Sequence, residues 1–94
     1  MLLTIDIGNT KTMMGLFREQ VLVHHWRIAT DIKNTTDEYA ITLLNLFKLD
    51  EEVEPEEIDG AIIVSVVPYM TQVVAEAVKK ISRVTPALFD HRFT

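Results

Sequence analysis

Three apolar segments near the start of the chain lie so close together that few folds can accommodate them. Hydrophobic residues alternate with other side chains over residues 2–7, and similar segments follow at 12–17 and 21–28. A period of two is typical of half-buried strands. The turn residues Gly8-Asn9-Thr10 end the first segment, and Arg18-Glu19-Gln20 joins the second to the third. Connections this short join antiparallel neighbours. The sequence therefore predicts a three-stranded antiparallel meander.

The rest of the chain alternates between helical and extended patterns. Thr35 and Glu38 have the spacing of a capping box, so a helix of about three turns is expected behind them. The apolar run 61–67 predicts a strand covered on both faces, the i, i+3, i+4 pattern from Met70 predicts a second helix, and residues 86–89 predict a last strand. The fold class is α/β, with the order β-β-β-α-β-α-β and a mixed sheet.

Composition and charge narrow the functional classes. Ninety-four residues allow one small domain, and the absence of cysteine favours a reducing, cytoplasmic compartment. Half of the 14 acidic residues lie between positions 50 and 59, and the net charge is −5. We interpret this run as a solvated connection that would repel a phosphate backbone, so no nucleic-acid partner is expected. No apolar run is long enough for a membrane span, so no membrane association is expected.

The segment from Asp6 to Thr12 is the best candidate for chemistry. Asp6 ends a strand, where a carboxylate can hold a hydrated Mg²⁺ ion. Gly8 lets phosphate approach the backbone and tolerates a positive φ, Asn9, Thr10 and Thr12 offer side-chain donors, and the turn amides can form an anion-binding nest. Taken alone, the same residues also fit an ordinary tight turn in which Asp6 and Asn9 bond to nearby backbone groups.

Other conspicuous side chains favour structural interpretations. His24 and His25 are adjacent on a predicted strand, so they face opposite sides and cannot bind one metal together. Trp26 is expected to pack in the core or at an edge, and Tyr39 to lie at the boundary of the apolar face of its helix. The individual role of Arg27 stays open between a phosphate contact and an ion pair.

The order of these elements resembles the opening of the actin, sugar kinase and Hsp70 superfold, an actin-like ATPase (ribonuclease H-like) lobe whose first hairpin turns around nucleotide phosphates. Four blocks, in order and spacing, are similar to type III pantothenate kinase: residues 6–10 (Asp-Ile-Gly-Asn-Thr), 26–30 (Trp-Arg-Ile-Ala-Thr), 36–39 (Thr-Asp-Glu-Tyr) and 65–68 (Ser-Val-Val-Pro). The resemblance covers the chain up to about Pro86.

The resemblance implies a kinase that phosphorylates pantothenate with ATP to 4′-phosphopantothenate, the first step of coenzyme A synthesis. It also implies Mg²⁺, a monovalent cation (K⁺ or NH₄⁺), and a homodimer. Carried onto this sequence, Asp6 helps to hold the metal. The nucleotide-binding segment comprises Asp6, Ile7, Gly8, Asn9, Thr10, Lys11, Thr12 and Met13, of which Lys11 and Met13 are the least secure.

Family members are much longer than this chain and have two lobes. We therefore expect residues 1–94 to form the N-terminal part of the first lobe, with the catalytic aspartate beyond Thr94 and the isolated chain inactive. Two alternatives remain from the sequence alone. One is a non-catalytic nucleotide-binding regulatory or assembly protein of the same superfold, and the other is a small interaction domain that uses the acidic surface.

Overall fold

The helices and strands follow the predicted order. The computed structural model describes residues 1–49 and 53–90, so positions 50–52 of the acidic run lie outside the described residues. The elements are β1 (Leu2–Ile7), β2 (Lys11–Arg18), β3 (Val21–Ala29), α1 (Thr36–Leu49), a short 3-10 helix η1 (Pro55–Glu57), β4 (Gly60–Ser65), α2 (Pro68–Ser82) and β5 (Ala87–Asp90). The order β-β-β-α-β-α-β is confirmed, with η1 as an addition.

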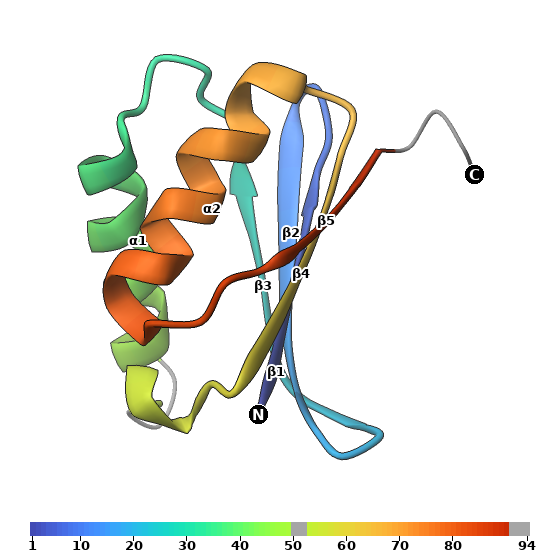
Figure 1. Ribbon diagram of the computed structural model, residues 1–94, viewed down its shortest axis with the longest axis vertical. Helices are drawn as coiled ribbons and strands as arrows, with labels where there is room; N and C mark the ends of the chain where they lie inside the picture. Colours follow the sequence, from blue (N-terminus) through green and yellow to red (C-terminus); the bar gives the residue numbers. More distant parts are fainter. Residues whose placement is uncertain (50–52, 91–94) are drawn as a thin grey trace.

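The strands form one mixed sheet in the order β3-β2-β1-β4-β5. The pairs β1–β2 and β2–β3 are antiparallel, which is the predicted meander. Strand β4 runs parallel to β1, and β5 runs parallel to β4. Figure 1 shows α1 and α2 side by side against one face of this sheet. Strand β1 is therefore central, with β2 on one side and β4 on the other.

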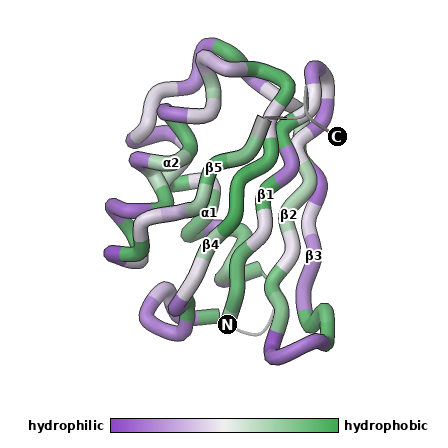
Figure 2. The backbone as a smooth tube through the Cα atoms, turned by 45° about the vertical axis from the view of Figure 1, so that its right-hand side comes forward, coloured by the Kyte–Doolittle hydropathy of each residue, from purple (hydrophilic) through white to green (hydrophobic). Residues whose placement is uncertain are grey.

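The core lies between the sheet and the two helices. Leu3, Ile5 and Ile7 of β1 are at most 2% exposed, whereas the residues between them face the other side of the sheet. In Figure 2 the central strands are largely green and the loops at their ends are largely purple, as this layering requires. The other large side chains buried in full include Leu16, Tyr39, Leu43, Phe47, Ile63, Met70, Val74 and Val78.

The predicted capping box at the start of α1 is present. The Glu38 amide donates to Thr35 Oγ1 over 3.2 Å, and the Thr35 amide donates to Glu38 Oε1 over 2.8 Å. This satisfies two amides that a helix start leaves without intrahelical acceptors. The helix has 14 residues, about four turns rather than three at 3.6 residues per turn. Phe47 near its end is fully buried and packs against Trp26, with the two rings tilted by 44° and their centroids 5.5 Å apart.

The expectation that β4 is covered on both faces is wrong for the described residues. Ala61 and Ile63 are buried under the helices, but Ile62 and Val64 on the opposite face are only half-buried. Both crossover helices pack on the same side of the sheet, which leaves the second face open. A shallow depression of about 350 Å³ lies on that open face, lined by Thr4, Asp6, Met13, Met14, Gly15, Phe17, Leu22 and His25.

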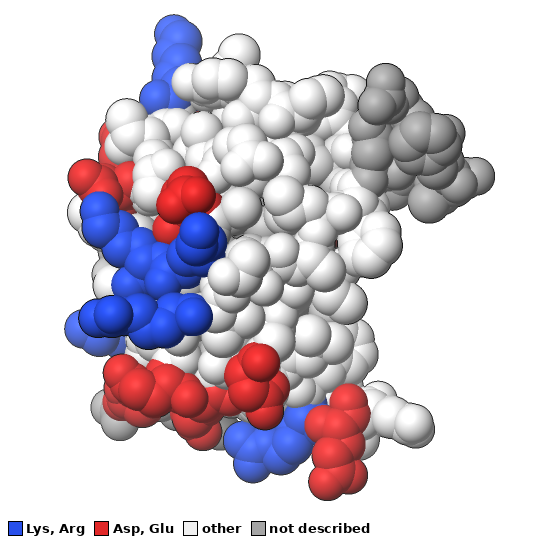
Figure 3. Space-filling view, viewed as in Figure 1, with Lys and Arg blue, Asp and Glu red and all other residues white. Residues whose placement is uncertain are grey.

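Charged side chains gather over the helices and at the end of the molecule near the first residue, as Figure 3 shows. Lys79 and Lys80 lie in the last turn of α2, and Lys80 pairs with Asp37 of α1. The Lys80–Asp37 pair and the Lys79–Glu76 pair are both exposed, so they contribute little to the free energy of unfolding. Among the described residues, the helices are too short or too polar to cross a membrane.

Candidate functional site

The turn between β1 and β2 lies where the chain changes direction within the sheet. Strands β1 and β4 are parallel and end together, with Ile7 paired to Ser65. The Val66 amide then donates to the Ile7 carbonyl over 3.0 Å, and α2 begins at Pro68. Strands β2 and β3, which come next in the sequence, lie on one side of β1, and β4 lies on the other. Ligands of open α/β sheets bind at such a switch point, at the carboxyl ends of the strands.

Thr30, which directly follows β3, fixes the orientation of this turn. Its amide donates to the Thr10 carbonyl over 2.8 Å, and its hydroxyl donates to the Gly8 carbonyl over 2.8 Å. Two carbonyl oxygens of the turn are thereby directed inward. Within the described part of the chain, the amides of Asn9 and Thr10 donate to no other group. Two consecutive turn amides that have no acceptor among the described residues are suited to bind an anion.

Gly8 is required for steric reasons. Its amide donates to the Lys11 carbonyl over 2.9 Å, which closes the turn. A β-carbon at position 8 would lie 2.9 Å from that same oxygen, closer than such atoms pack. The φ angle of Gly8 is not positive, so the conformational reason anticipated from the sequence does not apply. The close approach of one backbone segment to another is what excludes a side chain.

We therefore expect Gly8→Ala to distort the turn. The new methyl group must displace the Lys11 carbonyl, and overpacking of this kind lowers the free energy of unfolding by about 1–3 kcal/mol. Gly60→Ala is the matched control, because its β-carbon would meet only Leu2 Cδ1 at 3.4 Å. Thermal unfolding of both variants followed by circular dichroism checks this. Equal midpoints for the two variants would contradict the steric account.

The predicted nucleotide-binding residues divide between the two faces of the sheet. Asp6 pairs with Met13 across β1 and β2, so these side chains and that of Lys11 are on the open face, where all three are exposed. Ile7 and Thr12 form the next pair and are fully buried on the helix-covered face. The turn residues Asn9 and Thr10 are exposed, and Gly8 is half-buried.

Thr12 therefore has a different environment from the one its sequence position suggested. Its side chain is 0% exposed, and its hydroxyl forms a 2.8 Å hydrogen bond with the Thr30 hydroxyl. The Thr12 hydroxyl is linked to the turn through Thr30, so any effect on a bound phosphate passes through Thr30 and the backbone.

Asp6 is the only predicted metal ligand. The described residues contain no group of three or more His, Cys, Asp or Glu side chains able to hold an ion by themselves. A single carboxylate beside backbone amides that can donate to an anion fits Mg²⁺, which keeps several waters and shares its remaining contacts with substrate phosphates. It does not fit a site built from protein ligands alone, such as structural zinc.

Two residues near the turn were not identified as functional from the sequence. Thr30 was noted only within a block of family resemblance, and Tyr39 was expected at the boundary of an amphipathic helix. Tyr39 is in fact 1% exposed, and burial raises the pKa of its hydroxyl, against smaller opposing effects of Thr12 and the Asp31 backbone. The available signal was a pair of hydroxyl residues, Thr12 and Thr30, near the adjoining ends of two neighbouring antiparallel strands.

The histidines and the tryptophan have structural environments. His24 is half-buried and stacks on Trp26 with ring centroids 5.9 Å apart, while His25 faces the open side of the sheet. The prediction that His24 and His25 face opposite ways is confirmed. Trp26 is 8% exposed and packs against Phe47, so its predicted packing role is also confirmed.

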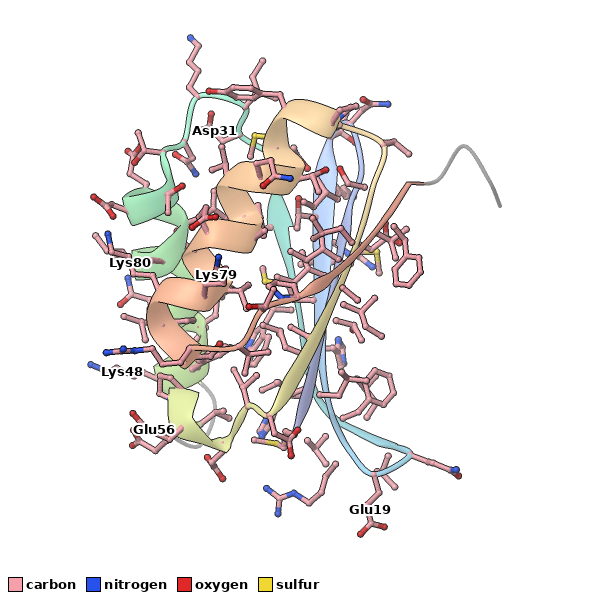
Figure 4. The ribbon with its side chains drawn as sticks, in the orientation of Figure 1. Glu19, Asp31, Lys48, Glu56, Lys79 and Lys80 are labelled. Atoms are coloured by element: carbon pink, nitrogen blue, oxygen red, sulfur yellow. The ribbon has the colours of Figure 1, made fainter. Side chains whose placement is uncertain are left out.

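A larger hollow, of about 670 Å³, lies at the opposite end of the sheet. Both of its cationic groups lie near carboxylates: the Met1 ammonium lies 3.4 Å from Asp59, and Arg18 lies 3.8 Å from Glu57. Figure 4 places Glu19 and Glu56 at this end, away from Asp31 in the connection between β3 and α1. The concentration of carboxylates there does not suit a phosphate ligand.

Comparison with known proteins identifies what this arrangement is similar to. The family model of type III pantothenate kinase matches residues 2–93. The type III pantothenate kinase of Halalkalibacterium halodurans is 44% identical over 88 residues, which cover 94% of this chain and 34% of that protein. The enzyme of Exiguobacterium sibiricum is 50% identical over 68 residues, covering 72% of this chain and 26% of that protein.

The chain thus spans about a third or less of the length of these curated relatives. Among solved structures, one from Porphyromonas gingivalis, provisionally assigned as an N-acetylglucosamine kinase, superposes on 96% of this chain and 34% of its own, with a TM-score of 0.68 and 15% identity. At that identity the likeness shows the fold, which is the predicted actin-like ATPase type.

Proposed function

We propose a kinase function for this chain, which belongs to the type III pantothenate kinase family: its first hairpin holds the phosphates of ATP while a phosphoryl group is transferred to pantothenate. The product would be 4′-phosphopantothenate, at the first step of coenzyme A synthesis. The observation that carries this proposal is the geometry of the turn at residues 8–11. Thr30 does not itself bind the phosphate in this proposal, but it holds two carbonyls of the turn inward. The Asn9 and Thr10 amides are then available to an anion.

Within this proposal, the residues from Asp6 to Met13 have different roles. The amides of Asn9 and Thr10 bind phosphate oxygens, and their exposed side chains add donors. Lys11 supplies a positive charge on the same face as Asp6, and Asp6 contacts the hydrated Mg²⁺ that neutralises phosphate charge. Ile7 and Thr12 support the turn from the core. Gly8 allows the close backbone approach.

The remaining features are proposed from family membership. They are a requirement for K⁺ or NH₄⁺, a homodimer, a cytoplasmic location, and residues 1–94 as the N-terminal part of a first lobe. Phosphoryl transfer needs a group that orients the attacking hydroxyl in line with the γ-phosphate. We propose that this group is a catalytic aspartate outside residues 1–94, because the chain spans only about a third or less of the length of its curated relatives.

The activity is tested with the whole protein expressed from its gene, supplied with ATP, Mg²⁺ and K⁺. We expect ADP release that depends on added pantothenate, with a product heavier than pantothenate by one phosphoryl group in mass spectrometry. Omission of pantothenate is the control. Binding of Mg·ATP without pantothenate-dependent ADP release would instead favour a non-catalytic nucleotide-binding protein. A protein that binds no ATP would contradict the phosphate site itself.

A further inference from the structure

We propose that Thr30 is a positioning residue for the phosphate-binding turn, although it contacts the turn from behind. The proposal rests on the function proposed above and adds a residue that family resemblance left without a role. Thr30 lies outside the segment from Asp6 to Met13. It is nevertheless bonded to that segment at two carbonyls, those of Gly8 and Thr10, each over 2.8 Å.

The direction of the hydrogen bonds follows from donor and acceptor counting. A hydroxyl has one hydrogen to donate and can accept at its oxygen. The Thr30 hydroxyl uses its hydrogen toward the Gly8 carbonyl, which can only accept. In its 2.8 Å contact with Thr12 it must therefore accept, and Thr12 donates. The result is a series of two hydrogen bonds: Thr12 donates to Thr30, and Thr30 donates to the Gly8 carbonyl of the turn.

Burial makes this series rigid. Thr12 is 0% exposed and Thr30 is half-buried, so water competes little for the bonds and a broken one leaves buried polar atoms unpaired. The Tyr39 hydroxyl is also buried and lies close to Thr12, and it has no hydrogen bond of standard geometry within the described residues.

The consequence for binding is pre-organisation. If the Gly8 carbonyl were released, the peptide between Gly8 and Asn9 could rotate, and the Asn9 amide would rotate with it because a peptide unit is planar. An amide that is already oriented costs nothing to orient when the anion arrives. Removal of the Thr30 hydroxyl should therefore weaken phosphate binding.

The test is Thr30→Val in the whole protein, which deletes the hydroxyl but keeps the backbone amide and the branched shape. We expect the Kd for Mg·ATP to rise by about tenfold, the upper range for one neutral hydrogen bond. Under the same conditions the KM for pantothenate should stay within about twofold, since no contact of Thr30 points to a second substrate. Thr30→Ser should restore most of the affinity, because it returns the donor.

Thr4→Val is the matched control. Like Thr30, Thr4 donates its hydroxyl to a glycine carbonyl, that of Gly15, over 3.4 Å, but it does so from β1 on the open face, away from the turn. Its Kd for Mg·ATP should be unchanged. If wild type binds Mg·ATP and Thr30→Val binds it equally well, or if Thr30→Ser fails to recover affinity, the positioning role is contradicted. If wild type itself binds no Mg·ATP, the proposed function fails instead.

Discussion

Val78→Asp is expected to abolish cooperative folding of this domain. Val78 is 0% exposed on α2, within the core formed with the sheet, and Val74 one turn earlier is 1% exposed. A carboxylate there would have to be desolvated without a partner, or take up a proton at a cost. Changes of this kind remove about 4–5 kcal/mol or more, comparable with the total stability of about 5–15 kcal/mol that small domains possess.

Gln72→Asp provides the control on the same helix. Gln72 is exposed near the start of α2, where a negative charge is favoured by the helix dipole. The free energy of unfolding of the Gln72→Asp protein should therefore differ from that of wild type by no more than about 0.5 kcal/mol. Urea unfolding followed by far-UV circular dichroism distinguishes the two variants. A Val78→Asp protein with the wild-type midpoint would show that α2 does not pack on the sheet as described.

Much of this fold follows from local patterns in the sequence. The alternation over residues 2–7 gives β1 at its observed ends, and the short turns force the antiparallel meander. Thr35 and Glu38 mark the start of α1 because a capping box is a contact between residues three apart. Signals of this kind need no knowledge of the tertiary structure.

Features that depend on pairing between distant segments were harder to predict. Both faces of β2 carry apolar residues, Met14 and Leu16 on one and Met13 and Phe17 on the other. The alternation therefore did not show that Thr12 points into the core. Only the register of β1 against β2, which pairs Ile7 with Thr12, decides this.

The Thr30 contacts also depend on pairing between segments that are distant in the sequence. Thr30 lies 22 residues from Gly8 in sequence, and it reaches the turn only because β3 pairs with β2 up to Ala29 opposite Lys11. Likewise, the apolar run 61–67 correctly predicted a strand but not how many of its faces the helices cover. That depends on both α1 and α2 packing on one side of the sheet.

The central claim is that the turn and Asp6 together hold a metal-bound nucleotide phosphate. Asp6→Asn should test the metal contribution, because it removes one charge and changes the side-chain volume little. Asp6 is exposed at a strand end, so the free energy of unfolding should change by less than about 1 kcal/mol. Asp37→Asn is the matched control: it is the same chemical change on the exposed surface of α1.

The most direct measurement is calorimetric titration of the whole protein with ATP, in Mg²⁺ and again in excess EDTA. We expect Asp6→Asn to weaken Mg·ATP binding by at least about tenfold, or 1.4 kcal/mol, because the carboxylate no longer attracts the hydrated ion. In EDTA the variant should bind ATP as well as wild type or better, since the carboxylate then only repels phosphate. Asp37→Asn should match wild type in both conditions. Equal binding of Mg·ATP by Asp6→Asn and wild type would contradict the account.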